Sequence, residues 1–216
     1  MLQVAIPVAD ALAYAHGQGI VHRDVKTTNV LMSVDGSPRL GDFGLALAIE
    51  EAPALKAGAG SPYSMSPQQW SGAAARSADD VYAFGALLYE LLSGYPPFYP
   101  DIDAAKVESQ PAPPLVERYP VAEDVIALVH RCLQKEPAQR PPMAEVAAGL
   151  RAALETERTR SAGPKAIGAP VLKPPPVAEV PLQARWQRSQ GASAGPTPAE
   201  LRSEGFRKGL TAAALL

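Results

Sequence analysis

The stretch His22-Arg23-Asp24-Val25-Lys26-Thr27-Thr28-Asn29, followed thirteen residues later by Asp42-Phe43-Gly44, decides how this sequence is interpreted. Both segments are polar, and the residues between them, 30–41, have the pattern of a β-hairpin. A hairpin returns the chain to the side from which it started. We therefore expect the polar side chains of the two segments to lie together.

The hairpin prediction rests on three short signals. Val30-Leu31-Met32 and Arg39-Leu40 predict two strands, and Asp35-Gly36 between them is typical of a two-residue turn. Residues 3–16, just before the quoted stretch, have apolar side chains at helical spacing. Gly17 follows them and is expected to end that helix.

The hairpin would bring Asp24, Asn29 and Asp42 together. Phosphoryl transfer from ATP with Mg²⁺ needs hard oxygen ligands for the metal, an acceptor for the proton of the nucleophile and a cation near the transferred phosphate. A cluster of these side chains would meet such needs.

These motifs resemble those of the eukaryotic-like Ser/Thr protein kinases, over about residues 2–155, which match the larger C-terminal lobe. The resemblance implies that Asp24 is the catalytic base and that Lys26 contacts the γ-phosphate. It implies that Asn29 and Asp42 hold Mg²⁺, so the expected cofactors are ATP and Mg²⁺. A lysine two residues after the aspartate resembles the Ser/Thr class rather than the Tyr class.

Other positions match the supporting residues of this family. Ser61-Pro62 and Ser66-Pro67 match the end of the activation segment, where a peptide substrate would dock. Asp80 would hold the backbone of the catalytic loop, and Arg23 would pair with a phosphorylated activation loop. The structural support implied by the resemblance comes from His22, Arg23, Phe43, Gly44, Gln68, Asp80 and Arg140.

Three features depart from the family pattern. The 216 residues contain no Gly-x-Gly-x-x-Gly loop and no strand lysine before the catalytic loop, so the N-terminal lobe is expected to be absent. Gln68 stands where the family has a glutamate paired with the arginine matched by Arg140, so a looser docking segment is expected. Residues 45–60 contain no Ser, Thr or Tyr to phosphorylate.

The apolar spacing predicts a mainly α (α+β) fold. Together with the resemblance, it implies a kinase-like C-lobe helical bundle with a short β-hairpin. A helix at 81–93, capped by Asp79-Asp80 and ended by Gly94, is apolar nearly all round and should be central. Further helices are expected at 121–135 and after Pro141-Pro142. We expect His16 and His130 to be structural or solvated, and Cys132 to belong to the core.

Charge and composition divide the chain in two. Residues 1–155 hold 11 Lys/Arg and 18 Asp/Glu, and residues 156–216 hold 9 and 4. The second part is rich in Pro and Ala, which predicts a disordered basic tail after a folded domain of residues 1–155. No signal peptide or membrane span is apparent, so we expect a cytoplasmic protein, or the cytoplasmic part of a membrane-anchored kinase whose span was lost.

Two functions of different classes remain open. The first is a Ser/Thr protein kinase fragment that phosphorylates Ser or Thr of a protein substrate. The second is a catalytically impaired, pseudokinase-like scaffold or binding module, because the lobe that clamps ATP is missing. A small-molecule phosphotransferase of related fold is a third, less favoured reading. A missing or separate N-lobe is an expected partner, nucleic acid is not, and a membrane is expected only if the C-terminus is truncated.

Overall fold

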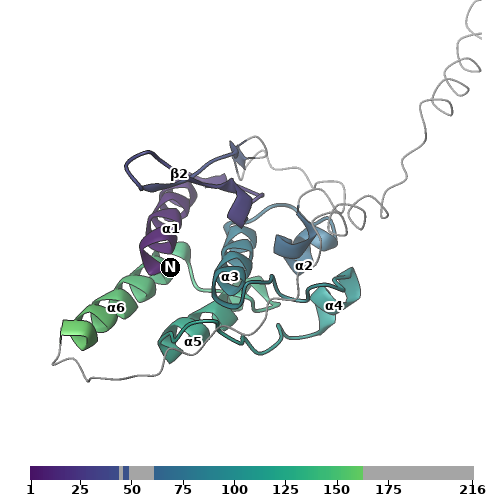
Figure 1. Ribbon diagram of the computed structural model, residues 1–216. Coiled ribbons are helices and arrows are strands. Elements are labelled where there is room, and N and C mark those ends of the chain that lie inside the picture. Colours follow the sequence, from purple (N-terminus) through teal and green to yellow (C-terminus); the bar gives the residue numbers. More distant parts are fainter. Residues whose placement is uncertain (44–45, 49–60, 163–216) are drawn as a thin grey trace, which may run out of the picture. The chain divides into compact units, whose positions relative to one another are not determined.

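The computed structural model of the chain describes residues 1–43, 46–48 and 61–162 (Figure 1). All of them belong to one unit that spans residues 1–169. Residues 44–45, with Gly44 among them, and residues 49–60 lie outside the described residues, and so does the part of the predicted tail from residue 163 onward.

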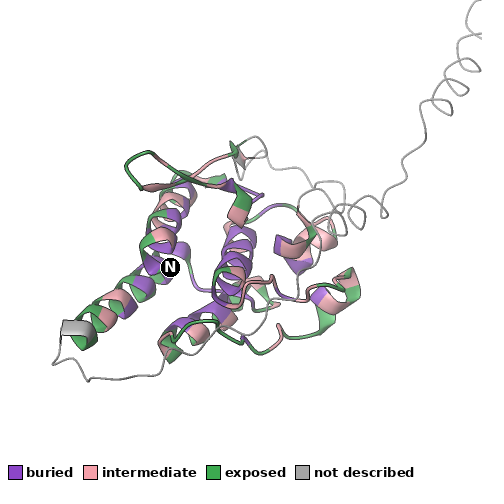
Figure 2. Ribbon diagram, viewed as in Figure 1, coloured by how far each residue is buried: buried purple, intermediate pink, exposed green. Residues whose placement is uncertain are grey.

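Helix α3 (Ser77–Ser93) forms the centre of the fold. Every residue from Asp79 to Tyr89 is buried, as expected for a helix that is apolar nearly all round (Figure 2). Gly94 ends the helix with a left-handed φ of 85°, which glycine adopts without steric cost. The predicted start at residue 81 is wrong. The helix begins at Ser77, and the carboxylate of Asp79 accepts a hydrogen bond from the amide of Arg76 (2.9 Å).

Helices α1 (Leu2–Gly17) and α6 (Met143–Ala162) pack along one another. The predicted helix at 3–16 is confirmed. Pro7 lies inside it on the exposed face, where no core contact depends on it. Helix α6 follows Pro141-Pro142 as predicted and continues seven residues past 155, where we expected the folded domain to end.

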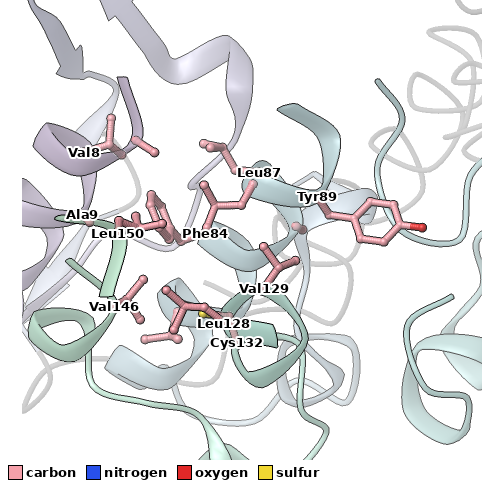
Figure 3. Close-up of a cluster of buried hydrophobic side chains, with 14 of the residues drawn as sticks. Val8, Ala9, Phe84, Leu87, Tyr89, Leu128, Val129, Cys132, Val146 and Leu150 are labelled. Carbon is pink, nitrogen blue, oxygen red and sulfur yellow. The ribbon is translucent and has the colours of Figure 1, made fainter. Parts of the chain in front are cut away.

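Helix α5 (Glu123–Cys132) completes the core against α3 and α6 (Figure 3). Val125, Leu128, Val129 and Cys132 are buried, at the helical spacing that the sequence shows. They join Phe84 of α3, which is fully buried, in one contiguous apolar cluster. The helix is shorter than the predicted span of 121–135.

The predicted hairpin is present, with a different turn. Strands β2 (Val30–Met32) and β3 (Pro38–Leu40) pair antiparallel. The amide of Ser33 bonds to the carbonyl of Ser37 (2.9 Å), so the loop has three residues rather than two. Gly36 takes the left-handed position that such a loop requires, with a φ of 79°.

A second small sheet and several short helical elements escaped prediction. Strand β1 (Ile20–Val21) pairs with β4 (Leu47–Ala48). Short helices and 3-10 turns lie where no helix was expected: η1 (Thr27–Asn29), η4 (Pro62–Ser64), α2 (Pro67–Trp70), α4 (Ala104–Ser109) and η5 (Pro137–Gln139). The mainly helical fold class is confirmed. Among the described residues, no helix is long and apolar enough to cross a bilayer.

The close contact between α3 and α5 at Gly85 gives a stability prediction. A Cβ there would lie 2.6 Å from the Cβ of Cys132 and 3.2 Å from Cγ of Leu133. Overpacking costs about 1–3 kcal/mol, which exceeds the gain of about 1 kcal/mol from higher helix propensity. Gly85→Ala should therefore lower the free energy of unfolding, measured by urea denaturation.

Gly17→Ala is the matched control, because nothing lies within 4 Å of a Cβ built at Gly17. It should be neutral or stabilising by up to about 1 kcal/mol. If both variants unfolded at the same urea concentration as the wild type, this result would contradict the close contact of α3 with α5 at Gly85.

The buried thiol gives a second prediction. Burial raises the pKa of Cys132 to about 12, partly opposed by the nearby Arg131 and Arg140. Because only the thiolate is nucleophilic, iodoacetamide at about pH 8 should leave the native protein unmodified. The same reagent should label Cys132 fully in guanidinium chloride, as mass spectrometry would show. Rapid labelling of the native chain would contradict the core placement.

Candidate functional site

The Asp24 carboxylate is buried and only half satisfied. Its Oδ2 accepts hydrogen bonds from Lys26 Nζ (2.6 Å) and Asn29 Nδ2 (3.2 Å). Its Oδ1 is buried and has no partner among the described residues. An unsatisfied buried carboxylate oxygen is costly, and a catalytic role or a bound water or ion would account for it. The loop thus holds one oxygen fixed and keeps the other available.

Asn29 is positioned by both sides of the hairpin. It ends the 3-10 turn η1, and its Nδ2 also donates to the backbone carbonyl of Asp24 (2.8 Å). The amide of Gly41, at the end of β3, donates to the backbone carbonyl of Asn29 (2.8 Å). With its Nδ2 committed to Asp24, Asn29 has Oδ1 left to meet a cation; this oxygen makes no hydrogen bond within the described part of the chain.

Asp42 follows the hairpin in a left-handed backbone conformation, with a φ of 60°. Its side chain is exposed, and it makes no hydrogen bond or ion pair to another described residue. The next residue, Phe43, packs its ring edge on His22 with centroids 4.5 Å apart. His22 Nε2 in turn bonds to the carbonyl of Gly41 (3.0 Å). The hairpin therefore returns Asp42 to the catalytic loop without direct contact to Asp24.

The loop that carries Asp24 is held by Asp80, which is 1% exposed. One carboxylate oxygen accepts the amide of Arg23 (2.8 Å). The other accepts the amide of His22 (2.7 Å) and bonds to Nε2 of His16 (2.8 Å). Asp80 was expected to hold this loop, whereas the contact of His16 was not predicted. No local signal identifies it, because its partner lies 64 residues away.

Arg23 is buried in a left-handed conformation, with a φ of 72°. Its Nε has no partner among the described residues. Burial lowers the pKa of the guanidinium, and the negative charges of Asp80 and Asp79 oppose this shift. The side chain is thus a buried cation balanced by carboxylates of α3 without a direct ion pair.

The segment expected to dock a substrate divides into an exposed and a buried part. Pro62 is exposed and Ser61 is partly exposed, whereas Ser66 and Pro67 are buried. The Ser66 hydroxyl donates to Asp79 Oδ1 (2.6 Å) and accepts the amide of Gln69 (3.1 Å). Ser66 therefore caps helix α2 and fixes this segment to Asp79 of α3.

Gln68 meets Arg140, as the family pattern implies, through Oε1 and Nη2 (2.6 Å). The arginine also keeps a negative partner, because its Nη1 lies 3.6 Å from Asp79 Oδ1. Burial lowers the pKa of Arg140, and Asp79 is the main opposing influence. The charge that Gln68 lacks is thus supplied from α3.

Lys135 lies beside this arginine and shows the effect of crowding two cations. Its carbonyl accepts hydrogen bonds from Gln68 Nε2 (3.0 Å) and Arg140 Nη2 (2.9 Å). Its ammonium donates to the carbonyl of Val107 and lies 4.9 Å from the centre of the Phe98 ring. Burial, and then the charge of Arg140, lower the pKa of Lys135 to about 8.

The donor set fits Mg²⁺ with a nucleotide. Asn29 supplies an uncommitted amide oxygen and Asp42 an exposed carboxylate, and Mg²⁺ in such sites takes one or two carboxylates together with phosphate oxygens. The described residues contain no group of three or more His, Cys, Asp and Glu that would hold a metal alone. The residues thus suit a metal that arrives with phosphate.

The sequence matches known proteins over most of the described chain. The model of the protein kinase domain matches residues 2–149. The chain is 37% identical over 158 residues to the serine/threonine-protein kinase PkaA of Streptomyces coelicolor, covering 68% of this chain and 28% of that protein. It is 35% identical over 202 residues to the serine/threonine-protein kinase PknA of Mycobacterium tuberculosis (strain ATCC 25618 / H37Rv), covering 89% and 44%.

An animal kinase is similar to this chain to a comparable degree. The serine/threonine-protein kinase PAK mbt of Drosophila melanogaster is 32% identical over 167 residues, which is 76% of this chain and 25% of that protein. The chain thus spans between a quarter and less than half of the length of these relatives. With the kinase model matching more than half of the chain and Asp24, Lys26 and Asn29 joined in one loop, the chain belongs to the protein kinase family, among the Ser/Thr kinases.

Proposed function

We propose that this chain carries the phosphoryl-transfer half of a Ser/Thr protein kinase, which moves the γ-phosphoryl group of ATP to a Ser or Thr hydroxyl. The observation that carries the proposal is the Asp24 carboxylate. One of its oxygens is fixed by Lys26 and Asn29, and the other is buried and unpartnered. A general base needs this arrangement, an oriented carboxylate with one free acceptor.

Each polar side chain then has a distinct role. Asp24 orients the substrate hydroxyl and accepts its proton. Lys26, a cation 2.6 Å from that carboxylate, stabilises negative charge on the transferred group. Asn29 and Asp42 would hold Mg²⁺, which neutralises the phosphate charge when bound with ATP. Positioning by a braced loop is the main contribution of the protein in such reactions.

The substrate class is a protein with Ser or Thr. Support comes from these relatives, which are called serine/threonine-protein kinases, and from the exposed Pro62 and the partly exposed Ser61 in the segment that matches the docking region. A cytoplasmic location belongs to the same proposal, because ATP is the phosphoryl donor. Family membership likewise supports the use of ATP and Mg²⁺.

A binding module without catalysis is the competing function. It is favoured by the absence of a Gly-x-Gly-x-x-Gly sequence from the 216 residues. Without such a loop in the chain, the phosphates would be covered from one side only, and water would weaken the electrostatic stabilisation. The two functions differ in one observable, which is transfer of phosphate by the purified chain.

Asp24→Asn tests the catalytic role. With Mg²⁺, γ-labelled ATP and a serine-rich protein acceptor, the purified chain should transfer label. Asp24→Asn should reduce the rate by about 10²–10⁴-fold, because the amide cannot accept the proton. Its melting temperature should stay near that of the wild type, since the side chain keeps its shape.

Asp101→Asn, on the exposed surface, is the matched control and should transfer label like the wild type. Equal rates for Asp24→Asn and the wild type would exclude Asp24 as the base. A wild-type chain that folds but transfers no label would favour the binding module.

Asp80→Ala tests the support of the catalytic loop. The substitution leaves the buried amides of His22 and Arg23 without an acceptor, so the free energy of unfolding should fall by about 2–5 kcal/mol. Glu155→Ala is the control, because its ion pair with Arg158 is exposed and should contribute at most about 0.5 kcal/mol. Equal losses for the two variants in urea denaturation would contradict the role of Asp80.

A further inference from the structure

The guanidinium of Arg140 is shared between two elements. Its Nη2 donates to Oε1 of Gln68 in α2 (2.6 Å), and its Nη1 lies 3.6 Å from Oδ1 of Asp79 in α3. The side chains of the arginine and the aspartate are almost fully buried. Within the described part of the chain, Asp79 is the one acidic residue that forms an ion pair with this arginine. The negative charge that a buried arginine needs therefore comes from α3.

Asp79 also holds the segment of residues 61–67, which matches the substrate-docking region. Its Oδ1 accepts the hydroxyl of Ser66 (2.6 Å), and Ser66 is fully buried. Between Ser66 and the surface lies the 3-10 turn η4, in which the amides of Ser64 and Met65 bond to the carbonyls of Ser61 and Pro62. A displacement of Ser66 would therefore be passed to the part of the segment that a substrate meets.

Positions 68 and 79 are two alternative places for one charge. A glutamate at position 68, which the family pattern has, would hold Arg140 from within the docking segment. Gln68 keeps that hydrogen bond but brings no charge. Asp79 meets a different nitrogen of the same guanidinium, so either position can supply the carboxylate. The aspartate differs in one respect, because it reaches the segment through the hydroxyl of Ser66.

We propose that Asp79 is a positioning residue for the protein substrate: it carries the charge that position 68 lacks and holds the docking segment through Ser66. The charge can be moved back, so a glutamate at position 68 should replace the aspartate. The effect on the substrate rests on the proposed function. The exchange of charge and the order of the segment do not, since both are properties of the folded chain alone.

The exchange of charge is tested by thermal melting of the 216-residue chain. Asp79→Asn should lower the melting temperature by about 5–15 °C, because it leaves Arg140 without its negative partner. Gln68→Glu alone should not raise the melting temperature, because Asp79 already balances the arginine and the bond from Gln68 Nε2 to the carbonyl of Lys135 (3.0 Å) is lost. Added to Asp79→Asn, the same substitution should recover most of the loss.

Asp101→Asn, an exposed carboxylate, is the matched control and should melt like the wild type. If Gln68→Glu lowered or left unchanged the melting temperature of the Asp79→Asn chain, the two positions would not share one charge. If Asp79→Asn melted like the wild type, Asp79 would not be the partner that Arg140 needs.

The hold on the docking segment is tested by amide hydrogen exchange. Asp79→Asn should speed exchange at Ser64 and Met65 by about tenfold more than at Val129 in α5, since the segment opens locally. Ser66→Ala cuts the same link and leaves the ion pair of Arg140 in place, so it should have the same local effect and replaces Asp79→Asn if that variant does not fold. Equal acceleration at all three amides would overturn the positioning role.

Kinetics then connect the segment to the substrate. With ATP, Mg²⁺ and a serine-containing peptide, Ser66→Ala and Asp79→Asn should raise KM for the peptide by about tenfold and leave kcat within about twofold, because the segment binds substrate without taking part in phosphoryl transfer. Gln68→Glu should restore KM in the Asp79→Asn chain. An unchanged KM, or a loss confined to kcat, would overturn the role toward substrate. A wild-type chain without transfer would instead contradict the proposed function, and amide exchange would still decide the hold on the segment.

Discussion

The buried carboxylate of Asp80 is the interaction on which the site depends. It joins the start of α3 to two segments that lie 57 to 64 residues earlier, namely the end of α1 at His16 and the loop at His22 and Arg23. An isolated buried charge would be costly, and three donors together with the nearby Arg23 offset this cost. The position of Asp24 follows, because its own amide comes directly after the two that Asp80 holds.

Asp79, the neighbour of Asp80, holds a second segment, the one that contains Ser66. It accepts the Ser66 hydroxyl and faces Arg140, so it anchors the segment that ends the long loop. Both carboxylates lie in the first turn of α3, where the helix dipole favours negative charge. One buried helix thus holds the loop that carries Asp24 with one aspartate and the segment around Ser66 with the other.

This arrangement explains how Gln68 is accommodated. Loss of a carboxylate opposite a buried arginine normally leaves an uncompensated charge. Here the amide oxygen of Gln68 keeps the hydrogen bond to Arg140, and Asp79 keeps the charge balance. The looser segment expected from Gln68 stays a prediction, and Asp79 is the acidic neighbour of Arg140 that this expectation left out of account.

The sequence by itself determined the longer helices and the hairpin, and it predicted which polar side chains of residues 22–29 lie together. Apolar spacing in α1, α5 and α6 and the glycines at residues 36 and 94 are local signals, and they act wherever the chain lies. The polar motif also identified Asp24, Lys26 and Asn29, which are within six residues of one another. The start of α3 was predicted wrongly, because Asp79 and Asp80 lie inside the first turn, where Asp79 also accepts the amide of Arg76 and Asp80 accepts amides of a distant loop.

Only the tertiary structure decided which partners these residues take. The bond of His16 to Asp80, the sharing of Asp79 between Ser66 and Arg140, and the pairing of β1 with β4 join residues that are 13 to 64 positions apart. A sequence pattern reports which face of an element is apolar, but a buried hydrogen bond requires an acceptor brought there by the packing of other elements.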